Sequence, residues 1–163
     1  MLDLEAQLRG WLEGCTRVSI LGIGNPMRGD DTVGVEIVRL MRRKVTRNVS
    51  LLDCEVVPEN FVGEVEAFRP THVLLVDAAE FEGAAGEARL ASPENVAGIT
   101  LSTHMISLSL LARIIQDRTK ASVMILGVQP KVLEFGEGLS PELEKASTRI
   151  SRVLLKVLRE SLR

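Results

Sequence analysis

Four side chains in this sequence are of types that could carry chemistry together: the adjacent carboxylates Asp30 and Asp31, the carboxylate Asp77 and the imidazole of His104. The two adjacent acids lie in ILGIGNPMRGDDTVGVEIV, Asp77 lies near the end of the apolar run THVLLVDA, and His104 lies in LSTHMIS. Two carboxylates and one imidazole form an O,O,N donor set that suits a borderline divalent metal such as zinc or nickel. Three protein ligands would leave coordination positions open for a substrate.

Each of these residues also has an ordinary structural explanation. An aspartate at the start of a helix commonly caps it or interacts with its dipole, which applies to Asp30 and Asp31. Asp77 could cap a turn, and His104 could be a surface or capping residue. One of the acids could also act as a general base instead of a ligand. The other histidine, His72, has no carboxylate near it in the sequence, and we interpret it as structural.

The glycines before the aspartates raise the possibility of a nucleotide site, which the spacing excludes. Gly22, Gly24 and Gly29 follow an apolar run, but the dinucleotide fingerprint requires glycine where Met27 stands. A phosphate-binding loop requires lysine where Asp30 stands. Two acids at a helix N-terminus would also repel a pyrophosphate. The loop therefore favours a cation over an anion.

The elements that must position these residues alternate along the chain. Apolar runs predict strands over residues 17–23, 49–57, 71–78, 86–92 and 122–128, the fourth being shorter and more exposed. Helical spacing marks five helices, through Leu4, Leu8, Trp11 and Leu12; Val33, Ile37, Leu40 and Met41; Phe61, Val65 and Phe68; Ile106, Leu110 and Ile114, with Ile115 as a further candidate; and Leu143, Ile150, Val153, Leu154 and Val157. Ser140 and Pro141 are placed to cap and open the last helix.

Strands that are apolar on both faces and alternate with helices are typical of a parallel sheet covered on both sides. We therefore expect an α/β fold: a three-layer αβα, doubly wound, mostly parallel sheet in a single domain over residues 1–163. Ligands of such sheets bind beyond the carboxyl ends of the strands, where the aspartates are expected.

Composition restricts the partners. The 163 residues carry a net charge of −2, which favours neither nucleic acid nor an anionic membrane surface. Aromatic residues make up 3% and tyrosine is absent, which argues against stacking on single-stranded nucleic acid. No apolar run is long enough for membrane insertion, and the first residues do not resemble a secretory signal. Cys15 and Cys54 lack metal-binding spacing and fit a reducing compartment, so we expect a cytoplasmic protein.

The segment GIGNPMRGDDTVG resembles the opening motif of the nickel–iron hydrogenase maturation endopeptidases, aspartyl-type proteases of the peptidase A31 type. The resemblance continues in the same order through PEN, RPTHVLLVDAAE, GEARL, STHMISL and LGVQP, and so covers most of the chain. These later segments are most similar to the hydrogenase-3, formate-hydrogenlyase-type subgroup. One departure is Thr32, which stands where the family commonly has glycine.

The resemblance implies a function. These enzymes remove a C-terminal extension from the precursor of the hydrogenase large subunit after nickel insertion. It implies Asp31, Asp77 and His104 as the catalytic and metal-binding residues, with the nickel supplied by the substrate and no tightly bound resident metal. Asp30 is then expected to cap the helix or to support the ligands. Gly24, Asn25 and Gly127 are expected to let the backbone approach the substrate.

Two alternatives use the same residues. The protein could be a metallopeptidase or amidase with a resident metal. It could also be a non-catalytic chaperone that holds the nickel site of the large subunit without cleaving it.

Overall fold

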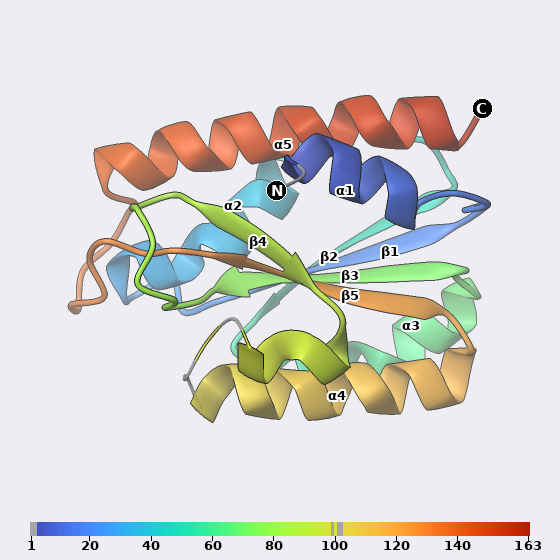
Figure 1. The fold of residues 1–163 in the computed structure, drawn as a ribbon, viewed down its shortest axis with the longest axis horizontal. Helices are drawn as coiled ribbons and strands as arrows, with labels where there is room; N and C mark the ends of the chain where they lie inside the picture. The colour runs from blue at the N-terminus through green and yellow to red at the C-terminus, as the bar shows by residue number, and fades with distance from the viewer. Residues whose placement is uncertain (1–2, 99, 101–102) are drawn as a thin grey trace.

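A five-stranded sheet forms the centre of the computed structural model, which describes residues 3–98, 100 and 103–163 (Figure 1). The strands lie in the order β2-β1-β3-β5-β4. β4 runs antiparallel at one edge, and the other strands are parallel. Their bounds are Val18–Ile23 (β1), Val49–Glu55 (β2), His72–Ala78 (β3), Ala88–Ala91 (β4) and Ser122–Val128 (β5).

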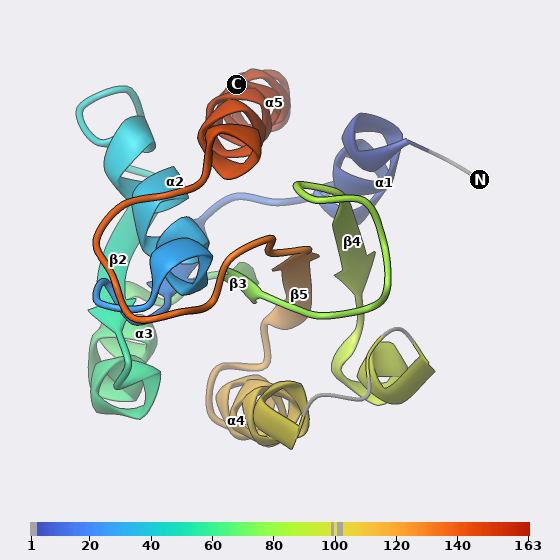
Figure 2. The ribbon, with the colours of Figure 1, turned by 90° about the vertical axis from the view of Figure 1, so that its left-hand side faces the viewer.

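Helices cover both faces of this sheet (Figures 1 and 2). One layer holds α1 (Leu4–Trp11), α2 (Val33–Met41) and α5 (Pro141–Ser161), and the other holds α3 (Val62–Phe68) and α4 (Thr103–Thr119). Short 3-10 turns precede three of the helices: Gly29–Thr32 (η1), Pro58–Phe61 (η2) and Pro93–Gly98 (η3). The prediction of a three-layer αβα, mostly parallel fold is confirmed.

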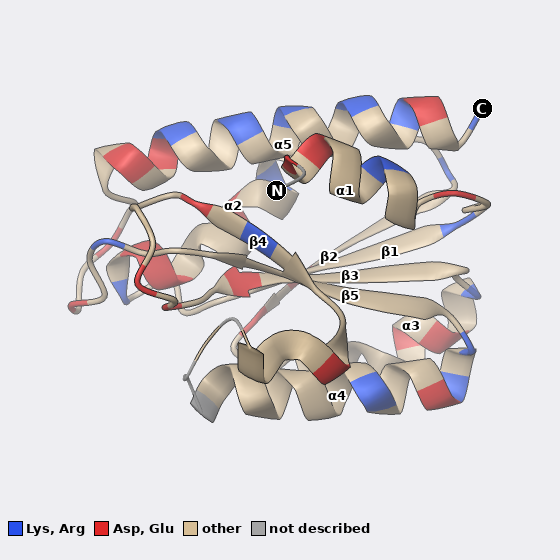
Figure 3. Ribbon diagram, viewed as in Figure 1, with Lys and Arg blue, Asp and Glu red and all other residues tan. Residues whose placement is uncertain are grey.

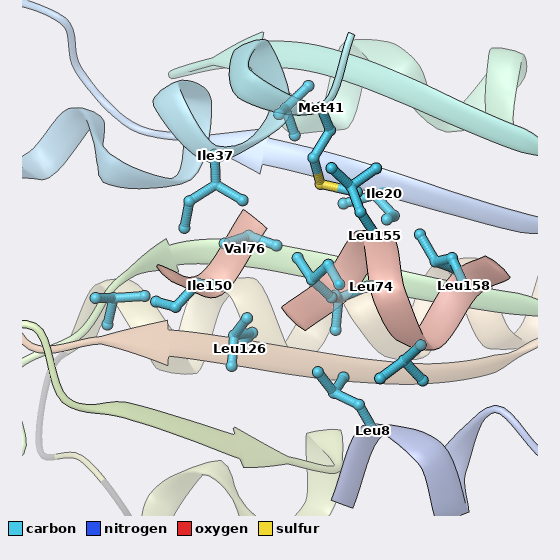
Figure 4. Close-up of a cluster of buried hydrophobic side chains, with 14 of the residues drawn as sticks. Leu8, Ile20, Ile37, Met41, Leu74, Val76, Leu126, Ile150, Leu155 and Leu158 are labelled. Atoms are coloured by element: carbon cyan, nitrogen blue, oxygen red, sulfur yellow. The ribbon is translucent and has the colours of Figure 1, made fainter. Parts of the chain in front are cut away.

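Successive residues of the central strands face different helix layers, because side chains alternate along a strand. Leu74 and Val76 of β3 belong to the hydrophobic core shared with α2 and α5, whereas Val73 and Leu75 belong to the core shared with α3 and α4. Figure 4 shows the first core, where Ile150 and other apolar residues of α5 pack over the strands. This double burial explains the continuous apolar runs in the sequence.

Helix α4 forms where the sequence predicts it, but the buried face is a different one. Ile106, Leu110 and Ile114 are exposed to solvent. The residues that pack on the sheet are Met105, Leu108, Ala112 and Ile115. Both sets recur at helical spacing, so the hydrophobic period alone does not decide which one faces the sheet.

Two further observations concern the cysteines and the helices. Cys15 and Cys54 are buried free thiols, and burial raises the pKa of Cys54 to about 12, so its thiolate is disfavoured as a metal ligand at neutral pH. None of the helices in the described part of the chain is long and apolar enough to span a membrane.

The order of the strands creates a topological switch point. From β1 the chain crosses to β2 on one side, and from β2 it returns to β3 on the other side of β1. The connections that follow β1 and β3 therefore leave on different faces, which opens a crevice beyond the carboxyl ends of these two strands. Asp31 follows β1, and Asp77 is the penultimate residue of β3, so the fold brings both to this crevice.

Candidate active site

Asp77 lies at the base of the site and is fully buried. It is paired with Gly127 of β5 and lies in a central strand, which keeps water from its carboxylate. Oδ1 accepts a hydrogen bond from the backbone N–H of Ala78 at 2.8 Å, and Oδ2 lies 2.5 Å from Nε2 of His104. Burial raises the pKa of Asp77 to about 6, and the nearby charge of Asp31 adds to the increase.

His104 is the second residue of α4, and its side chain is 59% exposed. The hydrogen bond to Asp77 raises the pKa of His104 above its ordinary value, with burial opposing the shift. Because one nitrogen of the ring faces Asp77 and the ring remains accessible, His104 can exchange a proton or a ligand with a molecule in the site.

Asp31 comes from η1, directly after the loop that follows β1. Its Oδ2 accepts a hydrogen bond from the backbone N–H of Asn25 at 3.0 Å, which fixes the carboxylate while leaving it partly exposed. Asn25 itself is held in a turn, because its Oδ1 accepts a hydrogen bond from the N–H of Met27 at 2.9 Å.

These groups meet at a pocket of about 230 Å³. Asp31 and His104 line this pocket, and Asp77 lies beneath His104. Its wall also includes Arg28, Glu80, Pro130 and Leu133. The pocket has room for a short stretch of peptide and presents it with the carboxylates of Asp31 and Glu80 and the imidazole of His104.

The three side chains that the sequence singled out are therefore close together, but they are not arranged around a common centre. Among the described residues, no three His, Cys, Asp or Glu side chains already form a group that could hold a metal ion. Nε2 of His104 is instead directed at Asp77. Ligation of a metal by all three would require this nitrogen to exchange the aspartate for the ion.

The structure assigns Asp30 a role that differs from helix capping. The side chain is fully buried and accepts hydrogen bonds from the segment that leads into α5. Oδ2 accepts from the N–H of Lys131 at 2.9 Å and of Val132 at 2.8 Å. Ser140 donates its N–H to Oδ1 at 2.7 Å and its hydroxyl to Oδ2 at 2.8 Å. Ser140 is the N-cap residue of α5, as expected, but its hydroxyl is bonded to Asp30.

The glycines named from the sequence allow close packing within the protein. Gly24 has φ +152°, and a Cβ atom there would overlap the backbone of Asp31. A Cβ atom on Gly127 would lie 2.7 Å from Cβ of Ala79. Both positions therefore approach protein atoms, contrary to the expectation that they face a substrate. Thr32 has φ −81°, which a residue with a side chain readily adopts, so its departure from the family pattern leaves the loop intact.

His72 is remote from this site, at the amino end of β3. Its Nδ1 lies 2.9 Å from Oγ1 of Thr71, and its ring makes an edge-on contact with Trp11. These contacts agree with its interpretation as a structural residue.

Sequence reasoning missed the wall of the pocket. Pro130 and Leu133 come from the segment between β5 and α5, which Figure 2 shows crossing the carboxyl end of the sheet beside the loop after β1. Two signals pointed to this wall: Pro130 ends the segment LGVQP of the family resemblance, and the whole segment directly follows a buried strand, where connections in a parallel sheet open toward the ligand side.

Comparison with known proteins supports the resemblance. Residues 35–157 match a family model described as hydrogenase maturation protease. The chain is 28% identical to a putative hydrogenase maturation protease of Methanocaldococcus jannaschii, over 96% of this chain and 97% of that protein. It is 30% identical to the hydrogenase 3 maturation protease of Escherichia coli, over 71% of this chain and 74% of that one.

A solved structure agrees. The crystal structure of the nickel–iron hydrogenase maturation protease HycI from Thermococcus kodakarensis superimposes with a TM-score of 0.87 at 34% identity, over 94% of this chain and 99% of that one. The chain belongs to the hydrogenase maturation protease family, and it is accordingly a hydrolase of the endopeptidase type.

Proposed function

We propose that this protein removes the C-terminal extension of a nickel–iron hydrogenase large-subunit precursor after nickel insertion, and that it recognises the nickel of its substrate through Asp31, Asp77 and His104. The observation that carries the proposal is the meeting of Asp31 and His104 in one pocket at the switch point, with buried Asp77 bonded to His104. Its relatives are named as proteases of hydrogenase maturation, which gives the substrate class.

Electrostatics support a cation in this pocket. Asp77 is fully buried, and this burial disfavours the charged form of the carboxylate in the free protein and raises its pKa. Asp31 adds a second carboxylate close enough to influence both Asp77 and His104. A divalent ion on the docked substrate would offset both charges, and it would displace the proton that the Asp77–His104 pair holds.

The donor set fits nickel that is already bound elsewhere. Carboxylate and imidazole bind nickel less strongly than the thiolates expected of a cysteine-rich cluster, so the pocket would contact this ion without removing it. A contact of this kind gains strength when the rest of the substrate is docked, because the metal then arrives at a high effective concentration. Precursor without nickel would lack the central contact and would keep its extension.

The same residues can assist hydrolysis. In the docked complex the ion would supply Lewis acidity, which would polarise a carbonyl or lower the pKa of a water molecule. Asp31, held by Asn25 and partly exposed, is the carboxylate that would take a proton from that water if it acts as a general base instead of a ligand. Asp77 fixes the orientation of His104.

The decisive experiment compares two precursors. Purified protease, with no metal added, is mixed with nickel-loaded and nickel-free precursor of the large subunit, and loss of the C-terminal peptide is followed by intact mass. We expect cleavage of the loaded form alone, and loss of that cleavage in His104→Gln but not in His72→Gln. Equal cleavage of both forms, with zinc bound to the free protease, would support a resident-metal peptidase. Binding without any change in mass would support a chaperone.

A further inference from the structure

The segment between β5 and α5 carries the most exposed large apolar side chain in the described part of the protein. Phe135 is 81% exposed, and Val132 in the same segment is 39% exposed. Met27, in the loop after β1, is 41% exposed. We refer to Met27, Val132 and Phe135 as the mouth patch. A single exposed apolar residue is ordinary, but a group beside an active-site pocket indicates a contact surface.

The backbones that carry the mouth patch lie side by side. Gly29 donates its N–H to the carbonyl of Gly136 at 2.9 Å, and Gly136 donates to the carbonyl of Met27 at 2.8 Å. The N–H of Asp30 donates to the carbonyl of Val132 at 2.8 Å. The three side chains therefore belong to one continuous strip of surface.

This strip is held firmly although it is exposed. The buried carboxylate of Asp30 binds the start of the segment at Lys131 and Val132 and its end at Ser140. An apolar side chain on a fixed loop loses little conformational freedom when a partner covers it, which is the property of a strong anchor in an interface. In Figure 1 this loop, in orange, projects beyond the carboxyl ends of the strands.

The strip is continuous with the pocket. Leu133 lies between Val132 and Phe135 in the sequence and lines the pocket together with Asp31 and His104. Arg28, next to Met27, lines it as well. A protein whose chain enters the pocket would therefore pass over the mouth patch. The pocket itself, at about 230 Å³, admits only a short peptide, so a folded substrate must make most of its contacts outside it.

The charged residues next to the mouth patch indicate which charges a complementary partner surface would carry. Glu134 and Glu137 flank Phe135 and are exposed, and neither has an ion-pair partner among the described residues. Figure 3 shows acidic positions together with a basic one on this loop, and the basic side chain of Lys131 is paired with Glu142. The complementary surface is an apolar socket with lysine or arginine at its rim.

We propose that the mouth patch is the docking surface for the folded body of the large-subunit precursor, with Phe135 as its anchor in an apolar, basic-rimmed socket. This inference rests on the proposed function for the identity of the partner. A different exposed apolar surface lies along α4, at Ile106, Leu110 and Ile114. We assign docking to the mouth patch because its segment, unlike these three residues, supplies part of the pocket wall.

Binding of the nickel-loaded precursor tests the proposal without requiring cleavage. Affinity is measured by biolayer interferometry for the wild type, Phe135→Ala, Phe135→Leu and Leu110→Ala. Leu110 is a matched control, since it is also a large apolar residue and is 62% exposed. We expect Phe135→Ala to weaken binding about tenfold or more, Phe135→Leu to recover much of the affinity, and Leu110→Ala to bind like the wild type. Thermal melts should be unchanged in all three variants.

The charge component has its own readout. Glu134→Gln combined with Glu137→Gln should slow association and reduce its dependence on salt, since rim charges act mainly on the encounter rate. An association rate of this double variant that matches the wild type at low salt would contradict the basic rim.

Failure of the docking surface and failure of the proposed function give different results. If Phe135→Ala binds as tightly as the wild type, or if Leu110→Ala alone weakens binding, the mouth patch is not the docking surface, although cleavage can persist. If the wild type binds but leaves the mass of the precursor unchanged, the protease function is wrong while the docking surface stands. If the wild type does not bind, both fail. If Phe135 instead mediates self-association in sedimentation, the patch belongs to a second copy of this chain.

Discussion

Asp30 and Asp31 are neighbours in the sequence but have different environments and partners. Asp30 is fully buried and bonded to residues of the segment that leads into α5, up to Ser140. Asp31 is partly exposed, accepts a hydrogen bond from the backbone of its own loop at Asn25, and lines the pocket. One carboxylate therefore holds the wall of the site and the other faces what the site binds.

Substitution of Asp30 should destabilise the protein. In Asp30→Asn an amide NH₂ replaces one carboxylate oxygen, and it would face an N–H or O–H donor that currently has an acceptor. A buried donor left without its acceptor costs about 1–3 kcal/mol, so we expect a loss of about 2 kcal/mol or more in the free energy of unfolding. Urea denaturation measures this change.

Ser140→Ala is the matched control for that experiment. It removes only the hydroxyl bond to Asp30 and keeps the N–H bond, so we expect a smaller loss of about 1 kcal/mol. An Asp30→Asn protein as stable as the wild type would mean that the buried bonds to Asp30 contribute little.

Substitution of Asp31 should reduce processing activity strongly and stability only slightly, in contrast to substitution of Asp30. Asp31→Asn keeps an acceptor for the N–H of Asn25, so we expect the free energy of unfolding to change by about 0.5 kcal/mol or less. If Asp31 has the role proposed above, processing of the nickel-loaded precursor should fall about 100-fold or more, because the variant lacks the negative charge of the carboxylate. Intact-mass kinetics and a thermal melt on the same sample check both statements. An unfolded Asp31→Asn protein would reveal a structural role instead.

Substitution of Asp77 should stabilise the free protein above neutrality while it abolishes processing. The folded pKa of Asp77 is raised from 3.8 to about 6, so the folded state binds the proton more tightly than the unfolded chain does. The resulting cost of charging the carboxylate begins near pH 4, grows through pH 6 and is complete about one unit above the folded pKa, where it is on the order of 3 kcal/mol. Asp77→Asn removes this cost and keeps an acceptor for the N–H of Ala78.

The measurement is the free energy of unfolding of the wild type and Asp77→Asn between pH 4 and pH 8. The difference should grow as the pH rises. His104 adds to this trend, since its raised pKa gives stability that is present below its unfolded pKa and lost as the pH rises through the folded one. A constant difference across this range would show that Asp77 does not titrate as described.

The rate of processing should depend on the protonation of His104. A histidine that binds a metal or accepts a proton must be neutral, and its bond to Asp77 raises its pKa. Processing should therefore decline as the pH falls, with a midpoint above the ordinary histidine value of about 6.5. His72→Gln should show the same profile as the wild type, because this second histidine lies at the other end of β3. A rate that stays constant from mildly acidic to mildly basic pH would contradict the role of His104.

The sequence alone determined the fold and the positions of the candidate catalytic residues. Strands such as β3 are apolar on both faces, and this pattern requires helices on both sides of a parallel sheet. Because parallel strands end at the same edge, the sequence placed Asp31 and Asp77 at one edge of the sheet. The pairing of β1 with β3 in the folded structure is what makes them neighbours. The motif around His104 then supplied the third residue through its resemblance to a known family. Two residues of the preceding segment, Leu101 and Ser102, lie outside the described residues.

Only the tertiary structure decided which groups contact one another across long separations in the chain. The bond between Asp30 and Ser140 joins residues 110 positions apart, and no local pattern distinguishes this arrangement from a helix cap. The buried face of α4 was equally undetermined, because two apolar sets share the helical period and packing against the sheet selects one of them. The wall of the pocket and the mouth patch follow from the path of the segment after β5, which the bonds to Asp30 fix.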